Sequence, residues 1–190
     1  MNTLFRGALI ALLFGLSSHM VQAAEYADTI KVFKNAGESS AYFGSSVGYA
    51  VFPTIGKGGI GLGGAYGKGK VYKHGKEIGT SDMAQVTIGF QLGGQAFSQI
   101  IFFEDEASLT NFTSGNFEFS ADASAVAITA AAGASANTGG GTSAGVSGGK
   151  NDADTASLGY RKGMAIFTVA KGGLMYQATL GGQKYSYEAM

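Results

Sequence analysis

Residues 57–76 read KGGIGLGGAYGKGKVYKHGK and contain a G-x-G-x-x-G pattern at Gly59, Gly61 and Gly64. In a dinucleotide-binding fold such a loop leads directly into a helix, whose N-terminus holds the pyrophosphate. Here every odd position from Gly59 to Gly69 instead carries a glycine or an alanine, and larger side chains occupy most of the even positions. A period of two predicts an extended strand with one nearly bare face. Because the sequence YKHGK then reads as a turn, the stretch predicts a β-hairpin.

The rest of the chain adds helices at its start and more strands after the hairpin. Apolar spacing in residues 25–36 predicts an amphipathic helix that Gly37 ends, with a short helical turn within 39–46. The carboxylates of Glu104–Glu106 favour the start of a short helix near 105–113. Strands are expected at 48–53 (ended by Pro53), 85–92 and 95–103, and in pairs within 157–189. Alternation also favours strand within 116–136, where the alanine content alone would fit a helix. The predicted fold is mainly β with N-terminal helices (α+β), an antiparallel β-sandwich or barrel-like sheet of about 8–10 strands.

The first residues have the layout of a secretory signal peptide. Arg6 precedes an apolar run of about ten residues, and Val21-Gln22-Ala23 provides small residues for cleavage. We expect cleavage after Ala23 or one residue later. Removal of residues 1–23 leaves one domain over 24–190 with a flexible polar loop at 137–157. An uncleaved N-terminal anchor is the alternative. The chain has no cysteine, so it has no disulfide and no site for a lipid anchor on a thiol. The expected location is therefore the periplasm, either free or peripheral on a membrane.

Charge and composition argue against nucleic acid and against catalysis. The formal net charge is zero, which disfavours a polyanionic partner. After signal cleavage the one remaining histidine is His74, which lies in a turn between lysines. Glu104–Glu106 resemble a solvated helix start more than an acid–base pair. Asp152 and Asp154 lack the other ligands of a calcium loop. The sequence therefore predicts no enzyme, no cofactor and no metal.

The distribution of lysines is the feature that bears on function. Five of the twelve basic residues that follow residue 23 fall in the hairpin: Lys57, Lys68, Lys70, Lys73 and Lys76. They can be solvated side chains that keep an edge strand from aggregating. They can also form a patch that binds the phosphates of anionic lipid headgroups, each lysine contributing up to about 1 kcal/mol. The interspersed tyrosines suit a membrane interface.

Four blocks of sequence carry a family resemblance: GYAVFPTIGKGGIGLGGAYGKGKVY, IGFQLGGQAFSQIIFFED, NFTSGNFEFSADASAVAITAAA and KGGLMYQATLGGQKYSYEA. In this order they resemble the SYLF-domain family, over about residues 26–187. The resemblance implies a lipid-binding module. Eukaryotic members bind phosphoinositides and some bind actin, whereas bacterial members are exported envelope proteins. We carry over binding of membrane phospholipid, and not of actin, which an exported bacterial protein would not ordinarily meet. The chain lacks the tryptophan of the eukaryotic pattern, which bears on phosphoinositide selectivity.

Two other readings stay open at the level of sequence. Alternating glycine and aromatic residues after a signal peptide also fit a small outer-membrane β-barrel. The terminal Met190 and the lysines that share a face with Leu62 and Tyr66 speak against it. The third reading is a structural or stress-related envelope protein whose contact with lipid is incidental.

Overall fold

The computed structural model describes residues 22–60, 62–88, 95–119, 126–128, 159–171 and 182–190. A helix over residues 22–35 is followed by two short helices, α2 (Gly37–Ser40) and α3 (Tyr42–Ser45). The strands are β1 (Gly48–Ile60), β2 (Leu62–Lys73), β3 (Lys76–Ile88), β4 (Gln95–Phe103), β5 (Phe117–Glu118), β6 (Val126–Ile128), β7 (Met164–Lys171), β8 (Gln183–Tyr185) and β9 (Glu188–Ala189). Helix α4 (Glu106–Phe112) lies between β4 and β5. The α+β, mainly β prediction is confirmed.

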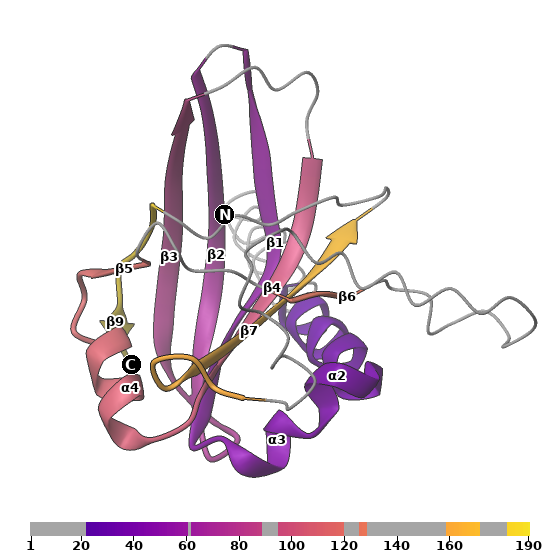
Figure 1. The fold of residues 1–190 in the computed structure, drawn as a ribbon, viewed down its shortest axis with the longest axis vertical. Coiled ribbons are helices and arrows are strands. Elements are labelled where there is room, and N and C mark those ends of the chain that lie inside the picture. The colour runs from indigo at the N-terminus through magenta and orange to yellow at the C-terminus, as the bar shows by residue number, and fades with distance from the viewer. Residues whose placement is uncertain (1–21, 61, 89–94, 120–125, 129–158, 172–181) are drawn as a thin grey trace, which may run out of the picture.

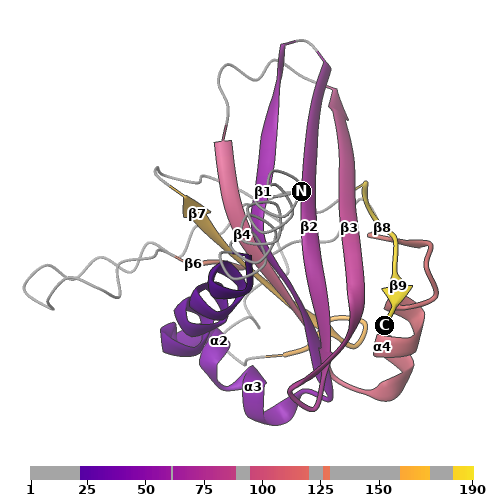
Figure 2. The same cartoon turned by 180° about the vertical axis from the view of Figure 1, so that it is seen from behind.

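The strands form one nine-stranded sheet in the order β5-β8-β3-β2-β1-β4-β7-β6, with β9 also paired to β3 (Figures 1 and 2). All pairings are antiparallel except that of β6 with β7. The turn between β2 and β3 has positive φ at both central residues, 48° at His74 and 77° at Gly75. These angles match a type I′ hairpin turn, whose twist suits the flanking strands. The hairpin predicted from YKHGK is therefore confirmed.

The predicted end of the first strand at Pro53 is wrong. Strand β1 continues through Pro53 to Ile60, although β1 lies inside the sheet between β2 and β4. The pairing register with β2 shifts between Val51 and Thr54, and that with β4 shifts between Phe52 and Ile55. A proline has no N–H to donate to a neighbouring strand. Because the pairing is irregular at Pro53 on both sides of β1, the strand continues through it without a regular backbone hydrogen bond being lost.

The glycines of β2 make room for the core. The small odd positions of β2 face inward, where Gly67 and Gly69 lie beneath the large side chains of β1. A Cβ at Gly69 would lie 2.5 Å from the ring of Phe52, and one at Gly67 would lie 2.6 Å from Ile55. The bare face that the alternation predicts is thus the packed face of the strand, and the lysine-bearing face looks outward.

The sheet is curled, so that strands at opposite ends of its order meet across its concave side. Gln99 on β4 donates from Nε2 to Oε1 of Gln183 on β8 at 3.3 Å and to the Tyr185 hydroxyl at 2.7 Å. The Tyr185 hydroxyl in turn donates to Gln183 Oε1 at 2.6 Å. Three strands separate β4 from β8 in the sheet. These contacts therefore close a half-barrel through its interior.

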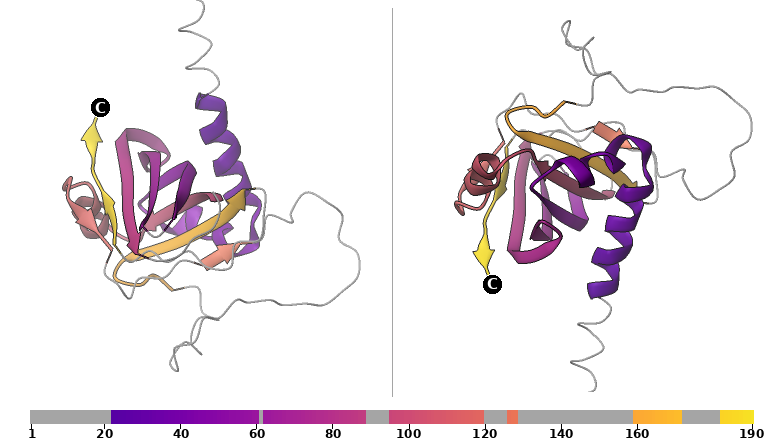
Figure 3. Two further views of the ribbon diagram at one scale, coloured as in Figure 1. Left: turned by 90° about the horizontal axis from the view of Figure 1, so that it is seen from above. Right: turned by 90° about the horizontal axis from the view of Figure 1, so that it is seen from below.

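Each face of the sheet carries its own apolar cluster. The concave face buries Phe52, Phe103 and Tyr185 with Phe112 of α4, together with smaller apolar residues. The outer face buries Phe102 and Phe167 beneath Phe33 of the first helix and Tyr42 of α3. Viewed end-on, the first helix lies outside the curled sheet, with α4 and the C-terminal strands at the far edge (Figure 3).

The first three strands extend beyond these covering elements (Figure 1). Pairing of β1 with β4 reaches Lys57, and pairing of β3 with β8 reaches Gln85. Past these points the described strands pair as a three-stranded ribbon, in which Gly58 lies opposite Gly64 and Gly64 opposite Val86. We call this part the projecting ribbon.

Several expectations fall outside the described residues. They include the loop expected at 137–157 and the end of the 85–92 strand. The short helix near 105–113 is confirmed as α4. Asp105 is the N-cap of this helix, and its side chain accepts a hydrogen bond from the Ser108 N–H at 2.8 Å. This bond also lowers the pKa of Asp105.

Candidate functional site

The five lysines of the predicted lipid-binding patch do not share one face. Side chains directly opposite each other in an antiparallel pair lie on the same side of the sheet. Lys57 is paired with Ala65, which belongs to the concave core. Lys68 and Lys70 alternate with the inward-facing positions of β2 and therefore lie on the outer face. The structure thus separates Lys57 from Lys68 and Lys70 by the thickness of the sheet.

Lys73 and Lys76 lie at the opposite end of the hairpin from the projecting ribbon. They are paired with each other next to the turn. The Lys73 ammonium lies 2.9 Å from the carboxylate of Glu106 on α4. His74 is exposed in the turn, with Nε2 4.0 Å from the same carboxylate. This end of the hairpin is therefore tied to α4 by charge.

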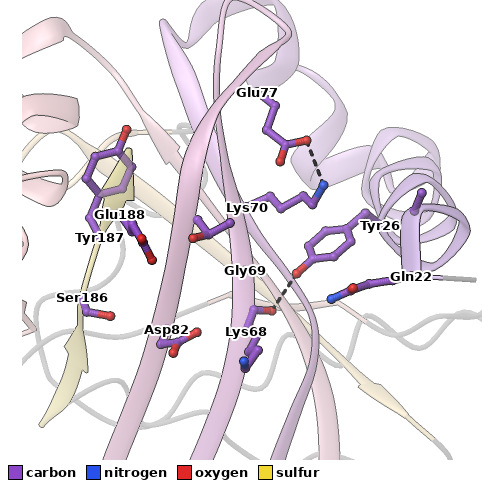
Figure 4. Close-up of a pocket in the computed structure, with 12 residues that line it drawn as sticks. Gln22, Tyr26, Lys68, Gly69, Lys70, Glu77, Asp82, Ser186, Tyr187 and Glu188 are labelled. Carbon is purple, nitrogen blue, oxygen red and sulfur yellow. Dashed lines mark hydrogen bonds and ion pairs between the residues drawn. The ribbon is translucent and has the colours of Figure 1, made fainter. Parts of the chain in front are cut away.

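Lys68 and Lys70 line an open trough on the outer face, which we call the outer trough (Figure 4). Its volume is about 660 Å³. The floor is formed by β2 and β3, and the two walls by the start of the first helix and by residues 186–188. The lining residues are Gln22, Ala23, Tyr26, Lys68, Gly69, Lys70, Glu77, Thr80, Asp82, Ser186, Tyr187 and Glu188.

Tyr26 fixes the first helix against the floor of the trough. Its hydroxyl donates to the carbonyl oxygen of Lys68 at 3.3 Å, and the Lys70 ammonium lies 5.1 Å from the centre of its ring. Lys70 also pairs with Glu77 at 2.9 Å. Burial, with a contribution from nearby carboxylates, raises the pKa of Tyr26 to about 12. Tyr26 is therefore an uncharged anchor at neutral pH.

The neighbouring residue, Glu25, makes a second attachment of the helix to the sheet. Its Oε1 accepts a hydrogen bond from the Thr54 hydroxyl at 2.6 Å and lies 3.2 Å from the Lys171 ammonium. The hydrogen bond from Thr54 is the main reason that the pKa of Glu25 lies below its ordinary value, and Lys171 adds to this effect. The start of the helix is thus held by two consecutive residues.

Lys68 is the lysine of the trough that remains available to a ligand. It is exposed and lies opposite Asp82 on β3, and within the described part of the chain its ammonium makes no ion pair. Asp82 accepts a hydrogen bond from the Tyr66 hydroxyl at 3.1 Å. In total, two ammonium groups line the trough together with three carboxylates, those of Glu77, Asp82 and Glu188.

An exposed apolar surface adjoins the trough and continues onto the projecting ribbon. Tyr66 precedes Lys68 on the outer face of β2 and is 50% exposed. Val86, on the same face of β3, is 73% exposed and lies opposite Gly64. Ala84, opposite Tyr66, is also exposed. An apolar strip therefore leads from the ribbon to the lysine of the trough.

The structure gives no support to the nucleotide-binding alternative. Residues Leu62–Lys73 form a strand where a dinucleotide loop would require a helix. Glu104–Glu106 stand at the start of α4, with Asp105 as its N-cap. Among the described residues there is no group of three side chains suited to hold a metal ion. Asp152 and Asp154 lie outside the described residues.

Sequence reasoning found two of the residues that line the trough and missed the others. Tyr26, Asp82 and Glu188 are separated by more than fifty residues from one another, and no local spacing links them. The alternation of β2 did indicate that Lys68 and Lys70 share a face. It could not indicate which elements stand beside them.

In the described part of the chain, no helix combines the length and the apolar character needed to cross a bilayer. A search of curated proteins found no match. A family model described as Las17-binding protein actin regulator (Ysc84) matches residues 84–188, which is more than half of the chain. This is the SYLF-domain family, a family of binding domains that is not known for a catalytic activity. The chain thus belongs to the Ysc84, or SYLF-domain, family.

Proposed function

We propose that this chain is an exported, non-catalytic protein of a bacterial cell envelope that binds anionic phospholipid. Its contact surface is the outer face of the projecting ribbon, the adjoining side chain of Tyr66 and the outer trough. The observation that carries the proposal is the continuity of the exposed Tyr66 and Val86 with the ammonium of Lys68, which makes no ion pair with any described residue. A phospholipid is complementary to this surface, because its apolar chains adjoin a negatively charged phosphate.

Each part of this surface has a role in the proposed contact. Tyrosine places an apolar ring and a polar hydroxyl at the level of the headgroups. Val86 would lie against the glycerol and the first acyl carbons, and Lys68 would reach the phosphate. A lysine close to an anionic membrane surface contributes about 1 kcal/mol. The expected attachment is therefore weak, reversible and sensitive to salt.

The same geometry assigns smaller roles to the other lysines of the hairpin. Lys70 and Lys73 are engaged with Glu77 and Glu106, so their charge is largely compensated. Lys76 lies at the turn, far along the strand from the projecting ribbon (Figure 1). The proposed site thus depends mainly on Lys68.

Charge reversal at two positions tests this proposal. The protein is sedimented with phosphatidylcholine vesicles that contain phosphatidylglycerol, and with vesicles of phosphatidylcholine alone. Lys68→Glu is expected to weaken binding to the anionic vesicles at least about fivefold, the equivalent of about 1 kcal/mol. Lys76→Glu changes the net charge equally and is expected to change binding by less than about twofold. Equal loss in both variants, or equal binding to both vesicle types, would refute the proposed site.

The description of the family model concerns Las17 binding and actin regulation. We do not propose these partners for this chain, because the proposed export would keep it away from the cytoplasm. Co-sedimentation with filamentous actin under the same conditions provides the comparison. Binding to actin that is tighter than binding to the anionic vesicles would favour the partner of the family description.

A further inference from the structure

The wall of the outer trough coincides with the expected site of signal cleavage. Gln22 and Ala23 line the trough at the start of the first helix (Figure 4). In the sequence these two residues end the segment Val21-Gln22-Ala23, whose small residues suit a signal peptidase. A cut after Ala23 would therefore remove part of the wall itself.

The charge of the trough is unfavourable for an anionic ligand while the chain is intact. Two ammonium groups and three carboxylates line it, and one of the ammonium groups, that of Lys70, already pairs with Glu77. A headgroup phosphate that approaches Lys68 would also meet Asp82, which lies directly opposite on β3. The trough needs a further positive charge to hold a phosphate.

We propose that cleavage between Ala23 and Ala24 completes the headgroup site by placing the α-ammonium of Ala24 at the rim of the trough. Water hydrolyses the amide bond: the new carboxylate leaves on Ala23, and the nitrogen of Ala24 becomes a protonated amine. This nitrogen is bonded to the carbonyl carbon of Ala23, a residue that lines the trough. The new charge therefore arises next to the residues that line the trough. The inference rests on the proposed function.

The residues that follow the cut hold the new terminus in place. Glu25 is bound to Thr54 and Lys171, and Tyr26 is bound to the carbonyl of Lys68. Tyr26 is only 5% exposed. A free N-terminus is usually mobile unless it is tied down. Here the attachment begins at the second residue of the processed chain, so the ammonium stays beside the trough.

The new ammonium gives the site a dependence on pH that lysines alone would not give. An α-amine ordinarily titrates near pH 7.7–8.0. On its own helix, the neighbouring titratable groups are the carboxylate of Glu25 and the phenol of Tyr26. Lys171 on β7 pairs with Glu25 at 3.2 Å. The other titratable groups that line the trough are Lys68 and Lys70 on β2, Glu77 and Asp82 on β3, and Tyr187 and Glu188 in the C-terminal segment. Acetylation of the α-amine leaves these groups unchanged, so the acetylated form measures their contribution to binding between pH 6.5 and pH 9. Loss of binding over this interval that the acetylated form does not share therefore reports on the α-amine.

The experiment compares two forms of the processed protein. The full chain is expressed in an exporting bacterium, and intact mass identifies the N-terminus of the purified protein. Half of the sample is acetylated selectively on the α-amine, and the mass and far-ultraviolet circular dichroism confirm a single acetyl group and an unchanged fold. Both forms are titrated with phosphatidylcholine vesicles that contain phosphatidylglycerol, whose phosphodiester keeps its charge at pH 6.5 and at pH 9.

The free amine is expected to bind about fivefold more tightly than the acetylated form at pH 6.5, the effect of one positive charge near an anionic surface. This advantage is expected to disappear at pH 9. An N-terminus other than Ala24, or equal binding of the two forms at pH 6.5, would overturn the inference and leave the proposed function standing. If neither form binds anionic vesicles, the proposed function fails and the inference fails with it.

Discussion

Replacing Tyr185 by phenylalanine tests whether the half-barrel is closed through its interior. The substitution removes only the hydroxyl, which accepts from Gln99 Nε2 at 2.7 Å and donates to Gln183 Oε1 at 2.6 Å. Tyr185 is 2% exposed, and both glutamines are fully buried. Burial raises the pKa of Tyr185, so the hydroxyl stays protonated throughout the ordinary range.

The expected loss of stability comes from the two glutamine side chains that lose the Tyr185 hydroxyl as a hydrogen-bond partner. Among the described residues, Gln99 Nε2 keeps only its 3.3 Å contact with Gln183, and Gln99 Oε1 and Gln183 Nε2 already have no hydrogen-bond partner there. An unsatisfied buried polar group costs about 1–3 kcal/mol. We therefore expect Tyr185→Phe to lower the free energy of unfolding by about 2 kcal/mol. With an m-value of about 2 kcal/mol/M, the urea midpoint would fall by about 1 M.

The matched control is Tyr66→Phe, which removes a hydroxyl from an exposed tyrosine that bonds Asp82 at 3.1 Å. Its effect on the free energy of unfolding is expected to be within about 0.5 kcal/mol. Urea titration followed by circular dichroism measures both variants against the parent protein. A loss below about 0.5 kcal/mol for Tyr185→Phe, or a loss equal to that of the control, would refute a closure that depends on this hydroxyl.

Two other properties of the fold can be measured in the same way. Gly69→Ala is expected to lower the free energy of unfolding by about 1–3 kcal/mol, because the added Cβ would lie 2.5 Å from the Phe52 ring. Gly56→Ala on β1, where an added Cβ meets no described residue within 4 Å, is the control and should not destabilise the protein. Alkaline titration should leave the free energy of unfolding constant up to about pH 10 and then lower it, because an unfolded tyrosine ionises near 10. In the folded chain, by contrast, burial is the main cause that raises the pKa of Tyr26 and Tyr72 to about 12. Stability that increases from pH 10 to pH 12 would contradict this assignment.

The regular elements of the fold could be predicted because their physical causes are local. Alternation in β2, the turn at His74 and Gly75, and the run Gln95–Phe103 each depend on neighbours in the sequence, and the structure has all three. Pro53 shows the limit of local reasoning. Its missing N–H was read as the end of a strand, but two register shifts beside it let a buried strand continue.

The candidate site could be predicted only in part, because its walls come from distant segments. The lysine count identified the hairpin, and alternation placed Lys68 and Lys70 on one face. The attachment of Tyr26 to β2, across 42 residues, leaves no trace in the spacing of the sequence. The compensation of Lys73 by Glu106 likewise depends on where α4 packs. A charge run in a sequence therefore shows how many lysines are near one another, but not how many are free.

The projecting ribbon is the part of the protein at which contact with a lipid surface is expected. A three-stranded ribbon rich in glycine gains little from burial, and glycine in a strand weakens it. In the described residues the three strands of the ribbon nevertheless stay in register, with Gly64 paired to Gly58 on one side and to Val86 on the other. Because the covered part of the sheet already buries both apolar clusters, the ribbon is not needed to form them. The ribbon is therefore available for a contact outside the fold, and Val86, at 73% exposure, is a side chain placed to make it. Attachment to a lipid surface is accordingly expected at the ribbon and at Lys68, rather than along the whole lysine-bearing hairpin.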